Sequence, residues 1–121
     1  APFEILRYLI GRIRTCEAAG IDKNAIAIDP GIGFGKKTAH NLQIFQQLAI
    51  FHASGCPVVV GASRKSFIGA IAGIDHPDFR LPGSLAAATL AASQGVKLHR
   101  VHDVDETKQA LALVHAIQEA R

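Results

Sequence analysis

Polar side chains lie at or just past the ends of three predicted strands of this 121-residue chain, and their types could bind an anion and a flat polar ligand. The five residues are Asp29, Ser63, Lys65, Arg100 and His102. In parallel α/β folds, ligands bind at the C-terminal edge of the sheet, so we expect these side chains to converge there. Arg100 and His102 lie two positions apart, so their side chains share one face of the last strand and favour an anion site. The alternative for Arg100 is a salt bridge on a partly exposed strand, although a buried strand seldom carries an arginine without a partner.

A glycine-rich segment follows the first of these strands. It reads Asp29-Pro30-Gly31-Ile32-Gly33-Phe34-Gly35-Lys36. The segment departs from the dinucleotide-binding fingerprint because Lys36 stands where a third glycine is needed, and from the phosphate loop because Pro30 replaces a glycine. Its glycines instead allow the backbone to approach a flat ligand closely, and the Asp29 carboxylate can accept paired N–H donors from an amino-heterocycle. The alternative is a simple turn that begins at Asp29.

The second segment, residues 61–66, carries Ser63 and Lys65. Ser63 could bind a ligand carboxylate, and Lys65 could donate to an acceptor oxygen because it is a flexible point charge. The alternative is that Ser63 or Ser66 caps the following helix. A nucleophilic serine–lysine pair is not supported, because the S-x-x-K spacing is absent and no residue is placed to orient a base.

Composition and spacing argue against several other kinds of site. The remaining histidines and the two cysteines, Cys16 and Cys56, lack metal-ligand spacing, so no metal site is predicted in this chain. The net charge of +3 has no polybasic block and aromatic residues make up 6%, which argues against a nucleic-acid partner. No apolar run reaches about 18 residues, so no membrane partner is expected. Without a secretory signal, the cysteines are expected to be reduced thiols and the protein cytoplasmic.

The hydrophobic pattern predicts one helix followed by three strand–loop–helix units. The predicted strands are 25–28, 57–60 and 97–102. The predicted helices are 3–19, 42–51, 66–72, 84–93 and 107–120, with a polar loop over 73–82 and a capping box over 103–106. Alternating strands and helices imply right-handed crossovers and a parallel sheet that is buried on both faces.

Three such units are too few to close a barrel. Three parallel strands leave two open edges, and a complete eight-unit barrel needs roughly 250 residues. The chain has 121 residues and contains no methionine. We therefore expect a single partial domain, residues 1–121 with no second domain, from the C-terminal part of a larger α/β protein.

Three segments, taken together in their order and spacing, resemble dihydropteroate synthase. They are residues 29–36, 61–69 and 100–104. The resemblance covers essentially the whole chain and implies the C-terminal portion of a TIM (β/α)8 barrel, βα units 6 to 8 plus a preceding helix. It implies a transferase of folate biosynthesis and a sulfonamide target. The reaction would condense 6-hydroxymethyl-7,8-dihydropterin diphosphate with 4-aminobenzoate, giving 7,8-dihydropteroate and diphosphate. Corrinoid-dependent pterin methyltransferases, which share the barrel but lack the Ser-Arg-Lys-Ser segment, are the alternative family.

The resemblance also implies roles for the strand-end residues. Asp29, Lys65 and Arg100 would bind the pterin, and Arg100 and His102 would bind the diphosphate. Lys65, Arg100 and His102 would form the catalytic set. Early loss of diphosphate would leave a pterin-methyl cation for the aniline nitrogen to attack. An anion pocket for the leaving group and a flat polar pocket for the cation fit this order of steps.

The second substrate and a cofactor are implied in the same way. Gly33, Phe34 and Ser63 would line the 4-aminobenzoate site. Mg²⁺ would be a cofactor whose asparagine ligand lies outside this chain. Because that ligand and other parts of the pterin pocket are missing, we expect the chain by itself to lack full activity.

A homodimer is implied for the full-length protein. The alanine-rich helix 84–93 would allow close helix approach, and the last helix would add Leu111, Val114 and Ile117. The alternative is that these helices pack against the chain's own barrel.

Overall fold

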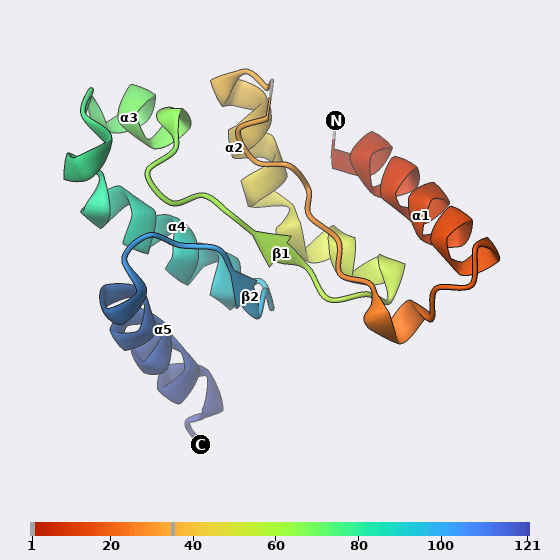
Figure 1. Cartoon of the computed structure of the whole chain (residues 1–121). Helices are drawn as coiled ribbons and strands as arrows, with labels where there is room; N and C mark the ends of the chain where they lie inside the picture. Colours follow the sequence, from red (N-terminus) through yellow and green to blue (C-terminus); the bar gives the residue numbers. More distant parts are fainter. Residues whose placement is uncertain (1, 35) are drawn as a thin grey trace.

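The computed structural model describes residues 2–34 and 36–121, so Gly35 of the glycine-rich segment lies outside it. The chain forms an α/β fold in which helices alternate with short strands (Figure 1). The strands are β1 Val59–Val60 and β2 Leu98–His99. The α-helices are α1 Pro2–Ala18, α2 Thr38–Gln46, α3 Ser66–Ala72, α4 Leu81–Ser93 and α5 Val104–Glu119. The 3₁₀ segments are η1 Lys23–Ala25, η2 Leu48–Ser54 and η3 Pro77–Phe79.

The sheet is parallel, as predicted, but its paired stretches are short. β1 pairs with β2 through Val59 to Leu98 and Val60 to His99. On the other side of β1, Ile28 forms a single parallel bridge with Val58. The order across the sheet is therefore Ile28, β1, β2. This order places the ends of the three predicted strands next to one another.

The first predicted strand, 25–28, is wrong over most of its length. Its start lies in η1, because the Asp22 side chain accepts a hydrogen bond from the Asn24 backbone N–H and caps this turn. Ile28 alone pairs with the strand beside it, at an edge where the described residues offer a partner on one side only.

Helix prediction is confirmed for α1, α3, α4 and α5, with shifts at the ends. α3 matches the predicted 66–72 residue for residue. α4 begins at Leu81 because Pro82 in its first turn is already set for a helical backbone. The loop predicted over 73–82 therefore also contains η3 and the first turn of α4. α5 begins at Val104, three residues before the predicted start.

The single helix predicted over 42–51 is wrong, because α2 and η2 divide this stretch. Gln94, at the end of α4, binds both sides of the break. Its Nε2 donates to the Phe45 carbonyl at 2.6 Å, and its Oε1 accepts from the Ala49 N–H at 3.1 Å. η2 ends at Gly55, whose φ of 76° is left-handed. A distant side chain therefore bridges the break between α2 and η2.

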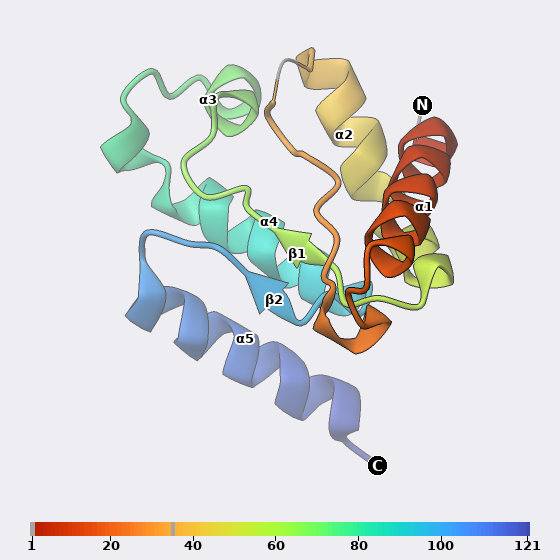
Figure 2. The ribbon, with the colours of Figure 1, turned by 45° about the vertical axis from the view of Figure 1, so that its right-hand side comes forward.

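The core lies between the strands and the surrounding helices. Its fully buried large side chains include Ile32, Ile44, Leu48, Phe51 and Val60. Each such side chain stabilises the fold by about 1.5–3 kcal/mol. Figure 2 shows α4 behind the strands and α5 below them, and these two helices pack against each other. This core fixes the strand ends from which the polar side chains project.

Within residues 2–34 and 36–121, no helix is both long and apolar enough to cross a bilayer. The same residues form no cluster of three or more histidine, cysteine, aspartate or glutamate side chains suited to a metal ion.

Candidate active site

Asp29 and Arg100 meet across the end of β1. Arg100 Nη2 lies 3.9 Å from Asp29 Oδ2, and the Arg100 side chain is 60% exposed. Gly61, directly after β1, makes this crossing possible. A Cβ on Gly61 would lie 2.6 Å from Arg100 Nη2, so any larger residue would displace the guanidinium. The salt-bridge alternative for Arg100 is thus confirmed, and most of the side chain still faces outward.

Asp29 uses its two oxygens differently. Its Oδ1 accepts a hydrogen bond from the Gly31 N–H at 2.7 Å, which forms the turn weighed as an alternative. Its Oδ2 lies toward Arg100. The turn and the ligand-binding interpretation are therefore compatible, because the turn orients the second oxygen.

Lys65 reaches from the end of the second strand to the glycine-rich segment. Its Nζ donates to the Ile32 carbonyl and lies 4.5 Å from the centre of the Phe34 ring. Gly33, with φ of 86°, passes so close that a Cβ would lie 2.8 Å from Lys65 Cδ. Burial lowers the pKa of the Lys65 amine, and the Arg100 charge lowers it further.

Two residues to which the sequence analysis gave no role in the site hold the glycine-rich segment. Asn41, buried on α2, accepts a hydrogen bond from the Gly33 N–H at 2.9 Å. Lys36 Nζ donates to the Gly31 carbonyl at 2.8 Å. Asn41 could have been noticed as a polar residue on the buried face of a helix, where an amide needs a partner.

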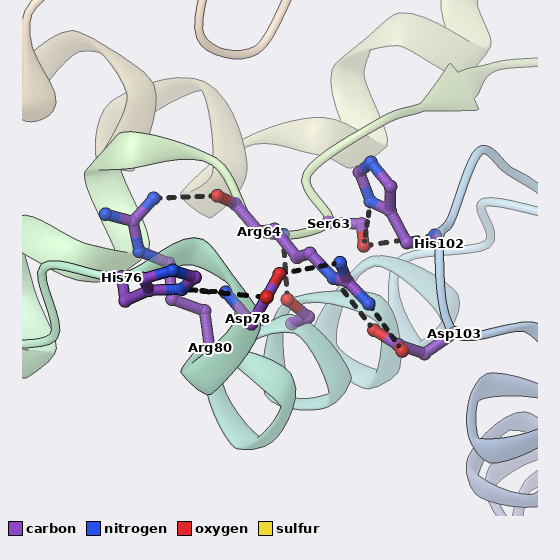
Figure 3. Close-up of polar contacts among 8 residues, drawn as sticks. Ser63, Arg64, His76, Asp78, Arg80, His102 and Asp103 are labelled. Atoms are coloured by element: carbon purple, nitrogen blue, oxygen red, sulfur yellow. Dashed lines mark hydrogen bonds and ion pairs between the residues drawn. The ribbon is translucent and has the colours of Figure 1, made fainter.

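Ser63 and His102 form one hydrogen-bonded unit (Figure 3). The Ser63 hydroxyl accepts from the His102 backbone N–H at 3.2 Å and lies 2.9 Å from His102 Nδ1. Ser63 is buried, whereas His102 is exposed. In the Nε2–H tautomer of His102 the Ser63 hydroxyl donates to Nδ1, and in the Nδ1–H tautomer the ring donates to the hydroxyl, which can accept a second hydrogen bond. Ser63 therefore lies beside His102, one of the two residues predicted to bind an anion.

Arg64, between the two predicted site residues Ser63 and Lys65, is held within the fold. Its Nη2 and Nε donate to the two carboxylate oxygens of Asp103 at 2.9 and 3.3 Å, as Figure 3 shows. Asp103 precedes α5 but makes no side-chain capping bond, so the predicted capping box is wrong. Its carboxylate is already bound by Arg64, and that hydrogen bond lowers the pKa of Asp103. Sequence patterns gave no signal for this pairing.

The arrangement suits a ligand with an anionic part and a flat polar part. Arg100 and His102 offer donors for an anion, and Asp29 Oδ2 offers an acceptor. Mg²⁺ prefers several oxygen ligands. Asp29 is the single carboxylate among the predicted site residues, and Arg100 already pairs with it. The described residues therefore do not by themselves suit a magnesium ion.

Comparison with known proteins agrees with the resemblance found in the sequence. The family model of pterin binding enzymes matches residues 3–102. Over 118 residues, the chain is 48% identical to the dihydropteroate synthase of Escherichia coli K12, covering 98% of this chain and 42% of that protein. The chain therefore spans less than half the length of this relative.

Solved structures agree in fold. A dihydropteroate synthase of Xanthomonas albilineans in complex with 7,8-dihydropteroate has a TM-score of 0.95 and 47% identity, covering 98% of this chain and 45% of that one. The same enzyme with 4-aminobenzoic acid gives the same TM-score and identity over 98% and 43% of the two chains. The α/β arrangement described above is thus part of a TIM barrel. The chain belongs to the pterin binding enzymes, and it corresponds to a portion of dihydropteroate synthase.

Proposed function

We propose that the full-length protein carrying this chain condenses 6-hydroxymethyl-7,8-dihydropterin diphosphate with 4-aminobenzoate to give 7,8-dihydropteroate and diphosphate. One observation carries the proposal: Asp29 follows the bridge at Ile28, Lys65 follows β1 and Arg100 follows β2, yet the three lie at one edge of the sheet. Arg100 contacts Asp29, and Lys65 lies over the segment that Asp29 begins. A carboxylate beside two cations suits a ligand that has both N–H donors and acceptor oxygens.

In this proposal, Asp29 Oδ2 accepts from the amino and ring N–H edge of the pterin, while Lys65 donates to its carbonyl and ring nitrogen. Arg100 and His102 hold the diphosphate. The bond between the pterin methylene carbon and the diphosphate oxygen breaks, and its electron pair leaves with the diphosphate. Donors at Arg100 and His102 stabilise that developing charge.

The aniline nitrogen of 4-aminobenzoate then forms the new bond to the methylene carbon and loses a proton. Gly33, Phe34 and Ser63 line its slot. Phe34 is 63% exposed beside Lys65, so its ring is available to a flat substrate. Because Ser63 is hydrogen-bonded to His102, the carboxylate of 4-aminobenzoate at Ser63 would lie close to the diphosphate site.

We also propose that the full-length protein is cytoplasmic, is sensitive to sulfonamides and binds a Mg²⁺ ion whose ligand lies outside this chain. In that protein, this segment would form βα units 6 to 8. The isolated chain would lack full activity.

We also propose a homodimer. α4 and α5 pack against each other within the chain, and Leu111 and Val114 are half-buried. Ile117 and Leu90 point outward with exposed fractions of 65% and 60%. The interface would therefore involve the outer apolar side chains of this helix pair. Sedimentation at micromolar concentration should give a dimer, and a monomer would contradict the assignment.

The function is tested with the full-length protein, both substrates and Mg²⁺, by following 7,8-dihydropteroate. Asp29→Asn should lower kcat/KM for the pterin diphosphate at least about tenfold, because one carboxylate hydrogen bond is worth roughly 1.5–3 kcal/mol. Asp22→Asn is the matched control, since Asp22 is exposed, caps η1 and should have no effect. Methyl transfer from a methylated pterin to a corrinoid, without dihydropteroate formation, would support the alternative family instead.

A further inference from the structure

Arg64 has an unusual backbone conformation. Its φ is 57°, and it is the only non-glycine residue with positive φ in residues 2–34 and 36–121. An L-residue in this region costs free energy and persists only where its surroundings stabilise it. Arginine has no side-chain preference for such a turn, so tertiary contacts must hold it.

Both backbone groups of Arg64 are held by other segments. The N–H donates to Ser84 Oγ on α4 at 2.8 Å, and the carbonyl accepts from Arg80 Nη1 at 2.8 Å. Arg80 is itself anchored, because it donates to the Ile74 and Asp75 carbonyls at 3.0 and 2.7 Å. The peptide groups on either side of Arg64 are therefore fixed in direction.

The Arg64 side chain connects this loop to the start of α5. Nη2 and Nε bind the two oxygens of Asp103, and Nη1 binds Asp78 Oδ1 at 3.3 Å. Asp103 directly follows His102, whose ring and backbone contact Ser63. The Arg64–Asp103 pair therefore holds together the two loops that supply the Ser63–His102 unit (Figure 3).

We propose that Arg64 is a positioning residue for the reaction: its left-handed backbone directs Ser63 and Lys65, and its pairing with Asp103 places His102 against Ser63. This inference rests on the proposed function. Arg64 touches no substrate in this assignment. It acts through its neighbours, and small displacements of reacting groups can cost about a hundredfold in rate.

The test uses variants of Arg64 in the full-length protein. Arg64→Gln removes the two-point pairing, and Arg64→Gly does so while removing the backbone cost of positive φ. Both should lower kcat/KM for the pterin diphosphate by about tenfold to a hundredfold per folded molecule. Arg64→Lys, which keeps the charge but loses the fork, should lie between these variants and wild type. Arg12→Ala, at an exposed arginine of α1, is the control and should have no effect.

A double-mutant cycle with Asp103→Asn tests whether the two residues act through each other. The Arg64→Gln, Asp103→Asn double variant should be no worse than the more impaired single variant. Wild-type kcat/KM in folded Arg64→Gly protein would overturn the proposal. The proposal would also be overturned if the losses of kcat/KM from the two single substitutions multiply in the double variant. The same holds if the unfolded fraction of the protein accounts for the whole loss of kcat/KM.

Failure of the proposed function has a different signature. A wild-type protein that forms no dihydropteroate would contradict that function, and the positioning role would then be measured by amine labelling of Lys65. Arg64→Gln should speed that labelling by releasing Lys65 from Ile32 and Phe34. An unchanged labelling rate would overturn the positioning role.

Discussion

Two arginines of this chain, Arg64 and Arg100, differ in how far the protein itself satisfies their guanidinium groups. All three guanidinium nitrogens of Arg64 donate hydrogen bonds to carboxylates. Arg100 makes an ion pair with Asp29 at 3.9 Å and keeps 60% of its side chain exposed. Arg64 therefore belongs to the folded framework, whereas Arg100 retains donors for a ligand.

The comparison explains why Arg100, and not Arg64, is proposed to bind a ligand: the Arg100 guanidinium is largely exposed, whereas the Arg64 guanidinium is held by carboxylates. Arg64 lies in the loop after β1 and Arg100 lies directly after β2, and both carry the same charge. Their neighbours differ, because Asp103 faces Arg64, whereas Gly61 leaves space beside Arg100. Substitutions in these two regions should therefore differ in their effects on ligand binding and on stability.

The largest effect is expected from Arg100→Ala in the full-length protein. Loss of a charge-assisted contact, roughly 1.5–3 kcal/mol, should weaken diphosphate binding about tenfold to a hundredfold. Because Arg100 is exposed, the unfolding midpoint in urea should stay at the wild-type value. Calorimetric titration of diphosphate measures the loss, and wild-type affinity in folded protein would show that this strand end is not the leaving-group pocket. His102→Ala should have a smaller effect of the same kind.

Two glycines give the next contrast. A Cβ on Gly69 would lie 2.5 Å from the Ile74 backbone carbonyl oxygen and 2.6 Å from Arg80 Nε. Gly69→Ala should therefore destabilise the fold by about 1–3 kcal/mol. The three atoms nearest to a Cβ on Gly61 all belong to the far end of the flexible Arg100 side chain.

Gly61→Ala should thus weaken diphosphate binding while leaving urea unfolding nearly unchanged. Chemical denaturation and calorimetry on both variants check the pair. Equal destabilisation by the two alanines would mean that the site at Gly61 is as tightly packed as the framework.

Acidification should lower the stability of the fold through Asp103. The hydrogen bond from Arg64 lowers the pKa of this carboxyl in the folded state. Between the folded and unfolded pKa values, the unfolded chain binds more protons, so stability falls as the pH drops below about 4. Asp103→Asn should be less stable than wild type near neutral pH and lose less stability on acidification. Urea unfolding between pH 6 and pH 3 measures both, and parallel profiles would contradict the role of the pair.

The smallest effect is expected in the pH dependence of Lys65 labelling. Burial and then the Arg100 charge lower the pKa of its amine, so Lys65 should react with an amine reagent at lower pH than an ordinary lysine. Arg100→Ala should move the labelling midpoint back toward the ordinary value, whereas Arg12→Ala should not. Mass spectrometry of labelled peptides across pH gives the midpoints. An identical midpoint in both variants would mean that Arg100 does not influence Lys65.

The sequence by itself determined the helices that carry a clear apolar period and the place where polar residues gather. Helical spacing located α1 and α5, and the run ending at Gly73 located α3. Asp29 directly follows the first predicted strand, Ser63 lies three positions past the second, and Arg100 lies near the end of the third, so the strand ends indicated these three residues. These are local properties, because periodicity and breaker residues act within a few positions of one another.

The tertiary structure alone decided which of these polar groups bind partners within the protein. Gln94 bridges the break after α2 from about fifty positions away, and Ser84 and Arg80 hold Arg64 in a conformation that its residue type does not favour. Asp103 fits a capping pattern in sequence but binds Arg64, 39 positions away. The hydrogen-bond partner of a side chain depends on distance and burial in the folded chain. A pattern in the amino-acid sequence contains neither quantity.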